Sequence, residues 1–296
     1  MPGLVASGRS WLRTPAARGL TLVSPPFLYA ILLLAVPIAA VVAFSFWTQD
    51  YLDLDRTPTL ANYKEAWTQP IYRVLMIRSL LVSGIVTACT VILAFPVAYY
   101  VSFHVAPGRK PLWIFLITIP FWTSYLMRIF LWKVILGYNG VVNGTLTQLG
   151  FIEEPLSFIL YNVNAVVITL SHAWAPFAIL PIFVALEKVD RSLLEAAADL
   201  GEGALHRFLR ITLPLALPGV IGASVIVFIP TVGDYVTPRL VGGPDGLLIA
   251  NMIELQFKKA NNPPLGAALA ISSMFIVGAL SLLIVRLTRR HLRNLS

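Results

Sequence analysis

The side chains that could bind a charged solute are few in this sequence. Asp234 and Tyr235 stand at the end of one apolar run, and Trp122 and Tyr125 stand within another. A carboxylate attracts an ammonium group, while an aromatic face stabilises the same group through a cation–π contact and packs against methylenes. The types of these four residues therefore suit a positively charged solute with an apolar stem.

Two charged residues further along the chain bear on this hypothesis in opposite ways. Glu254 could supply a second carboxylate to the same solute. Arg239 is a fixed cation that would repel the solute, unless Asp234 or Asp245 neutralises the guanidinium. Three other cations within apolar runs are interpreted as anchors at the membrane interface, because their side chains are long enough to reach water: Arg78, Arg128 and Lys133.

The arrangement of polar residues does not predict catalysis. A P-loop requires the pattern GxxxxGK[ST], and each lysine of this chain is followed by a residue other than Ser or Thr. The four histidines are scattered without metal-ligand spacing, and no nucleophile, base and orienting group occur together. We therefore expect no catalytic, cofactor-binding or metal-binding residue in this chain.

The composition is that of a membrane protein. Hydrophobic residues make up 57% and charged residues 12% of the 296 residues, and the mean hydropathy is +0.79. Runs of about 20 apolar residues, enough to cross a hydrocarbon core of about 30 Å, recur along the chain. We predict an all-α membrane protein with six transmembrane helices, at Pro25–Phe46, Leu75–Val101, Leu112–Leu136, Phe158–Ala185, Leu215–Val236 and Leu265–Val285.

The distribution of Lys and Arg predicts how these helices are oriented. With the N-terminus inside, the cytoplasmic segments hold thirteen basic residues and the outer segments hold six. Since short cytoplasmic loops retain positive charge, both termini are expected in the cytoplasm. The chain then divides into a basic tail (1–24), a six-helix domain (25–286) and a second basic tail (287–296). These flanking residues explain the net charge of +8, so no nucleic-acid partner is expected.

The cytoplasmic loop between the fourth and fifth spans, residues 186–214, is predicted to form two short helices. Ser192 and Glu195 have the spacing of a capping box at the start of the first helix. Gly201 interrupts the helical pattern, either by adopting angles that other residues avoid or by allowing a close approach. A second amphipathic helix then ends at Pro214 and Pro218. Periodicity alone permits two arrangements, a compact protrusion or a segment lying flat on the membrane.

The outer segment between the fifth and sixth spans is predicted to hold another amphipathic helix. Leu248, Met252 and Leu255 recur at positions i, i+4 and i+7, after a stretch broken by glycines and a proline. Such a helix could cap the bundle or form part of a docking surface.

The cytoplasmic loop resembles the EAA loop of permease subunits of ATP-binding cassette (ABC) importers. In that family the loop is the coupling helix that inserts into a groove of the cytoplasmic ATPase. The sequence departs from the family at Glu202, where a small residue is more usual, and this puts details of the ATPase contact in question. The residues of this chain that match the motif are Glu195, Ala196, Ala197, Gly201, Phe208, Ile211, Leu213 and Pro214.

The resemblance extends from about Pro25 to Arg286. Stretches such as "PFWTSYLMRIFLWKVIL" and "GDYVTPRLVGG" are similar to those of spermidine/putrescine-type permeases. It implies the type I importer bundle in a bacterial inner membrane, a second permease subunit or second copy, an ATPase dimer that holds ATP and Mg²⁺, and a periplasmic solute-binding protein. The implied solute is a polyamine, although related permeases also carry amino-acid derivatives, opines and phosphonates.

Two other classes of function compete with this interpretation. An ion-coupled carrier would need carboxylates near the membrane midplane, and the predicted spans offer almost none. A membrane scaffold without transport is compatible with the spans but leaves the EAA loop unexplained.

Overall fold

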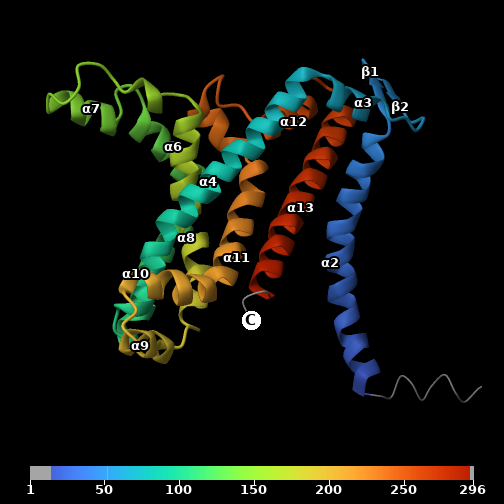
Figure 1. Ribbon diagram of the computed structural model, residues 1–296. Helices are drawn as coiled ribbons and strands as arrows, with labels where there is room; N and C mark the ends of the chain where they lie inside the picture. The colour runs from blue at the N-terminus through green and yellow to red at the C-terminus, as the bar shows by residue number, and fades with distance from the viewer. Residues whose placement is uncertain (1–14, 52, 294–296) are drawn as a thin grey trace, which may run out of the picture.

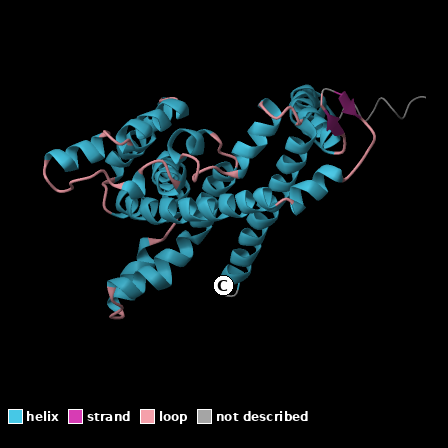
Figure 2. Ribbon diagram, turned by 90° about the horizontal axis from the view of Figure 1, so that it is seen from above, coloured by secondary structure: helices cyan, strands magenta, loops and turns pink. Residues whose placement is uncertain are grey.

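The computed structural model describes residues 15–51 and 53–293, and it is helical apart from one short hairpin (Figure 1). The first helix, α2 (Pro15–Ser45), begins ten residues before the predicted start of the first span at Pro25. Strands β1 (Thr48–Asp50) and β2 (Asp53–Asp55) pair antiparallel. Seen from above, the two strands lie at one edge of the molecule (Figure 2). The short helix α3 (Ala61–Thr68) leads from the hairpin back to the bundle.

Three long helices form the main core of the protein. They are α4 (Pro70–Phe103), α8 (Val163–Leu186) and α11 (Leu213–Val232), and their buried residues make one continuous apolar cluster. These helices are apolar on nearly every side, as expected where one face meets a neighbouring helix and the other meets lipid. Helix α13 (Pro263–Arg293) packs with α3, α4, α11 and α12 around a second cluster.

Close approach between α8 and α11 depends on a glycine. A Cβ added at Gly219 would lie 2.5 Å from the carbonyl oxygen of Pro181 and 2.5 Å from the Cβ of Ala185. Small residues at such crossings let helix backbones approach closely, which is how helices associate in membranes without a hydrophobic driving force.

The third predicted span, Leu112–Leu136, is wrong as a single straight helix. The chain forms η1 (Pro107–Arg109), α5 (Lys110–Thr118) and η2 (Ile119–Trp122), breaks, and resumes as α6 (Tyr125–Leu136) and α7 (Val141–Gln148). The two halves meet at 86°. The extended backbone of Thr123, with φ −94° and ψ 146°, interrupts the hydrogen-bond ladder three residues after Pro120.

Five described helices are therefore long and apolar enough to cross a membrane, or six if the bent pair counts as one span. The predicted number of six spans is reached only if the bent pair is counted as one span. Helix α2 leaves most of its described side chains exposed, although it lies beside α13 (Figure 1).

The predicted amphipathic helix after the fifth span is α12 (Ile249–Lys258), which follows the short turn η5 (Pro238–Gly242). It lies at the end of the bundle that also holds α3 and the hairpin (Figure 1). Helix α4 holds its start in place, because the Ser79 hydroxyl accepts a hydrogen bond from the Ile249 backbone N–H at 2.8 Å. Arg78 donates to the Asp245 carbonyl at 2.9 Å, so this cation secures a loop.

Candidate functional site

The loop that resembles a coupling helix begins with α9 (Arg191–Asp199) at the opposite end of the molecule from α12 (Figure 1). Asp190 caps this helix by accepting a hydrogen bond from the Ser192 backbone N–H at 2.9 Å. The predicted capping box at Ser192 is therefore wrong, because the helix starts two residues earlier than that motif requires. The hydrogen bond to the Ser192 N–H also holds the pKa of Asp190 below its ordinary value.

Gly201 ends α9 with a left-handed backbone, at φ +83°. The Gly201 N–H donates to the Ala198 carbonyl and the Glu202 N–H donates to the Ala197 carbonyl, at 2.9 and 3.0 Å. This pair of bonds is the Schellman motif, which favours glycine because a Cβ is strained at that φ. No heavy atom lies within 4 Å of a Cβ added at Gly201, so the backbone angle and not space within this chain requires glycine.

The second half of the loop does not end at Pro214 as predicted. Helix α10 (Ala204–Arg207) passes through a π-helical turn, η4 (Phe208–Thr212), directly into α11. Residues 204–232 form one continuous span. Pro214 lies in the first turn of α11, where the wide turn has already shifted the hydrogen bonds, so its missing N–H interrupts little.

Two contacts join the halves of the loop. Arg207 donates to the Leu194 carbonyl at 3.3 Å, and Arg210 pairs with Glu202 at 3.2 Å. The second pair is exposed, and such pairs contribute less than about 1 kcal/mol. Glu202, the residue that departs from the family pattern, thus has a partner within its own loop.

The loop has an anchored base and an uncovered tip. At the base, the ring of Phe208 packs edge-on against Phe95 of α4, with centroids 5.6 Å apart. At the tip, Leu200 is 85% exposed and Leu205 is 67% exposed. Apolar side chains left uncovered on a helical protrusion are typical of a docking surface. Among the other motif residues, Glu195 and Ala196 are exposed, whereas Ala197, Ile211, Leu213 and Pro214 are partly buried.

A polar cluster ties this loop to the bundle. Glu187, just after α8, accepts hydrogen bonds from Ser102 of α4 at 2.6 Å and from Lys110 of α5 at 2.7 Å. Arg191 of α9 donates to the Ser102 carbonyl at 3.0 Å. Burial alone would raise the pKa of Glu187, but the hydrogen bonds from Lys110 and Ser102 and the nearby cations hold it below its ordinary value. The ends of four helices therefore meet at one carboxylate.

Asp234, the predicted solute-binding carboxylate, is buried and already has hydrogen-bond partners. One oxygen accepts from the backbone N–H groups of Val236 and Thr237, at 2.9 and 3.3 Å. The other accepts from the Tyr125 hydroxyl at 2.7 Å. Asp234 thus starts the helical turn after α11 and orients Tyr125, and both of its carboxylate oxygens already accept hydrogen bonds within the chain.

Tyr125 is also the end of a lane of aromatic rings that sequence analysis did not find. We use "aromatic lane" for Phe121, Phe177, Trp174 and Tyr125, whose successive ring centroids are 4.2, 5.2 and 6.2 Å apart. The lane crosses the break in the bent span and combines residues of η2, α6 and α8. Trp174 and Phe177 stand three residues apart on α8, a helical spacing that signals a shared face, but only the fold brings Phe121 and Tyr125 to that face.

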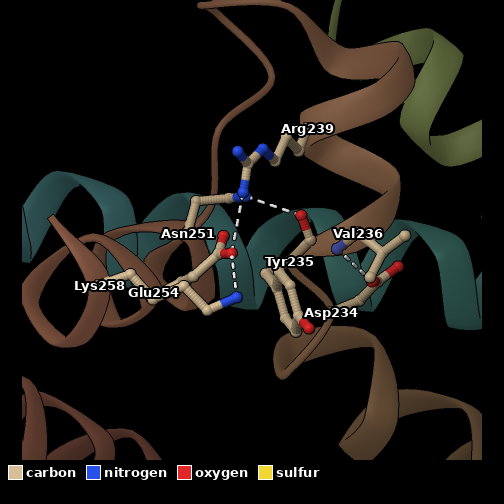
Figure 3. Close-up of polar contacts among 7 residues, drawn as sticks. All are labelled: Asp234, Tyr235, Val236, Arg239, Asn251, Glu254 and Lys258. Carbon is tan, nitrogen blue, oxygen red and sulfur yellow. Dashed lines mark hydrogen bonds and ion pairs between the residues drawn. The ribbon is translucent and has the colours of Figure 1, made fainter.

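The other residues predicted to contact the solute are not part of this lane. Trp122 is 81% exposed. Tyr235 is directed toward α12, where its carbonyl accepts a hydrogen bond from Asn251 at 2.8 Å (Figure 3). Lys258 lies 5.7 Å from the centroid of the Tyr235 ring.

Glu254 pairs with two cations and is not free for a solute (Figure 3). Its carboxylate lies 2.8 Å from Arg239 and 3.0 Å from Lys258. Burial would raise the pKa of Glu254, but the two cations hold it below its ordinary value. Arg239 is therefore paired with Glu254, which it shares with Lys258, and neither of the predicted partners, Asp234 and Asp245, is paired with it.

Comparison with known proteins identifies the family. Residues 16–294 match the model of the "Binding-protein-dependent transport system inner membrane component" family. The chain belongs to this family. It is 37% identical over 255 residues to the spermidine/putrescine transport system permease protein PotB of Haemophilus influenzae, a match that covers 86% of this chain and 88% of that protein. It is 34% identical to PotB of Escherichia coli, over 88% of this chain and 94% of that protein.

The fold of the permease is shared with solved transporters. A chain of a bacterial ABC transporter involved in the import of the acidic polysaccharide alginate superposes with a TM-score of 0.73 and covers 95% of this chain and 96% of its own, at 16% identity. At that identity the likeness concerns the fold alone. The permease therefore has the architecture of ABC importer membrane subunits and is an inner membrane component of such a transport system.

Proposed function

We propose that this permease forms one half of the path of an ATP-driven importer for a polyamine. The solute is inferred from the names of the PotB relatives and from the pairing of an aromatic lane with a buried carboxylate. Polyamines carry ammonium groups separated by methylenes, and a row of rings offers cation–π contacts to the former and apolar surface to the latter. The charge of Asp234 at one end of the lane favours entry of a cation, although Arg128, whose guanidinium lies 5.9 Å from the Tyr125 ring centroid, offsets part of that charge.

The observation that carries the coupling role is the exposed tip of the cytoplasmic loop. A separate ATPase dimer, which holds ATP and Mg²⁺, docks on α9 and α10, while this chain catalyses no reaction. A second permease subunit, homologous or identical, completes the path, and a periplasmic solute-binding protein delivers the polyamine. This arrangement places α9 and both termini in the cytoplasm and α12 in the periplasm.

The Glu187 cluster supplies a route for coupling in this proposal. When the ATPase pair closes, α9 moves with it, and Arg191 and Glu187 transmit the displacement to the ends of α4 and α5. Helix α5 leads through η2 to the break at Thr123, between Phe121 and Tyr125 of the aromatic lane. ATP and the loaded binding protein then each favour one of two packings of the same helices, so transport follows from a population shift.

Uptake by the complete importer tests the proposed solute. Sealed right-side-out vesicles that carry the permease with its second permease and ATPase enclose ATP and Mg²⁺, and the binding protein and radiolabelled spermidine are added outside. We expect accumulation that vanadate abolishes and that putrescine inhibits. Absence of ATP-dependent spermidine accumulation, together with ATP-dependent accumulation of a labelled phosphonate, opine or amino-acid derivative, would assign the importer to another solute.

A further inference from the structure

A basic pocket lies on the exposed side of α12, about 190 Å³ in volume. Three cations and one carboxylate are among its walls, so the pocket carries net positive charge. The pocket is lined by Arg239, Leu247, Asn251, Glu254, Leu255, Lys258 and Lys259.

The one carboxylate of the pocket is less exposed than the cations around it. The Glu254 side chain is only 12% exposed, whereas those of Arg239 and Lys258 are 56% and 64% exposed. Arg239 donates to Glu254 through one guanidinium nitrogen, and Glu254 is its only side-chain partner among the described residues. A guanidinium carries five N–H donors, so most of those of Arg239 are unused by other side chains. Lys259 forms no ion pair within the described part of the chain. The pocket therefore presents spare donors and positive charge outward, which suits an anion and repels a polyamine.

The pocket is held on a rigid support. Asn251 accepts from the Leu248 backbone N–H at 3.0 Å and donates to the Tyr235 carbonyl at 2.8 Å, which fixes the start of α12 to the segment that follows α11. Ser79 and Arg78 fasten the same start to α4. Groups that are already ordered lose little entropy when a partner binds.

We propose that this pocket receives an acidic side chain of the solute-binding protein. The inference rests on the proposed function, which places α12 on the periplasmic side, at the end of the bundle opposite the coupling loop. Leu247 and Leu255 flank the cations and offer apolar contact to the methylenes of a glutamate. Complementary charges of this kind speed the encounter and select the orientation of docking.

Charge reversal at Lys259 is the primary test, because Lys259→Glu leaves both ion pairs of Glu254 intact. In the complete importer, the concentration of its own binding protein that half-maximally stimulates ATP hydrolysis should rise about 10-fold at low salt. High salt should weaken the wild type more than the variant, because exposed charges are screened. Arg239→Gln should act in the same direction. Lys64→Glu, the same reversal on α3 outside the pocket, is the matched control and should change little.

Two further experiments distinguish docking of the binding protein from binding of a lipid headgroup. A Glu→Lys or Asp→Lys scan of the binding protein should yield one variant whose weakened stimulation is restored by Lys259→Glu. Unchanged half-maximal concentrations in Lys259→Glu and Arg239→Gln would overturn the proposal. An effect that follows the anionic lipid content of the vesicles and not the binding protein would assign the pocket to a lipid headgroup instead. Loss of ATPase association in the wild type would count against the proposed function and not against this pocket.

Discussion

In the proposed path, the contacts of a few single residues determine how a cation is bound. The rings of the aromatic lane come from three elements, and Tyr125 is oriented by its hydrogen bond to Asp234. Asp234 and Tyr125 were predicted from their residue types, but their mutual contact could not be, because 109 residues separate them. Glu254 was predicted to face the path, and no sequence pattern indicated that it pairs with Arg239 and Lys258 instead.

Trp174→Leu should weaken the interaction with polyamine. A desolvated cation–π contact contributes about 1–2 kcal/mol, so we expect the half-saturating spermidine concentration in vesicle uptake to rise about 5- to 30-fold. The control is Trp113→Leu on α5, outside the lane. Equal effects of the two substitutions would remove the lane from the path.

Gly219→Ala should destabilise the contact between α8 and α11, because the added Cβ would meet the Pro181 backbone at 2.5 Å. Overpacking of this kind costs about 1–3 kcal/mol, so the midpoint of thermal unfolding in detergent should fall by several degrees. Gly222→Ala on the same helix has no heavy atom within 4 Å of the new Cβ and should leave the midpoint unchanged. A midpoint that is the same in both variants would contradict the packing described above.

At the scale of elements, sequence patterns predicted the long helices well and their interruptions poorly. Apolar runs of about 20 residues identify spans from composition alone. The break at Thr123 and the π-helical turn at 208–212 depend on local backbone geometry that hydropathy does not record. Pro214 predicted a helix end because proline lacks the N–H that continues a helix. The π-helical turn before it has already shifted the hydrogen bonds, so the missing N–H interrupts little and the helix continues.

Glu187 is the element-scale test of coupling. Glu187→Gln removes the charge that Lys110 and Arg191 face, so transport should fall several-fold while basal ATP hydrolysis persists. Glu202→Gln breaks an exposed pair in the same loop and should have little effect. If Glu187→Gln transports as well as the wild type per ATP hydrolysed, the cluster plays no part in coupling.

The pKa of the Glu187 carboxylate predicts how coupling depends on pH. Because the folded-state pKa of Glu187 is below its ordinary value, its stabilising contribution is present above the ordinary glutamate pKa and is lost as pH falls through the folded-state value. Coupling measured between pH 6 and 8 should therefore show no Glu187 titration. A transition in that window that disappears in Glu187→Gln would contradict this assignment.

At the scale of the whole molecule, the two ends of the bundle serve two partners in the proposed arrangement. In a background where Cys89 is replaced by Ser, Lys259→Cys should react with a membrane-impermeant thiol reagent added outside cells, and Glu202→Cys should not. The predicted excess of cytoplasmic Lys and Arg is the physical basis for this orientation. The reverse labelling would invert the topology and place the coupling loop on the wrong side of the membrane.

Docking of a separate ATPase on α9 is tested most directly at Gly201. Gly201→Val places a β-branched residue at φ +83°, whereas Gly203→Val places the same residue at φ −67°, which it adopts readily. In the complete importer we expect Gly201→Val to reduce both ATPase co-purification and binding-protein-stimulated hydrolysis at least 10-fold, with normal membrane insertion, and Gly203→Val to retain both. Normal stimulated hydrolysis and uptake by Gly201→Val would contradict the coupling role of this loop.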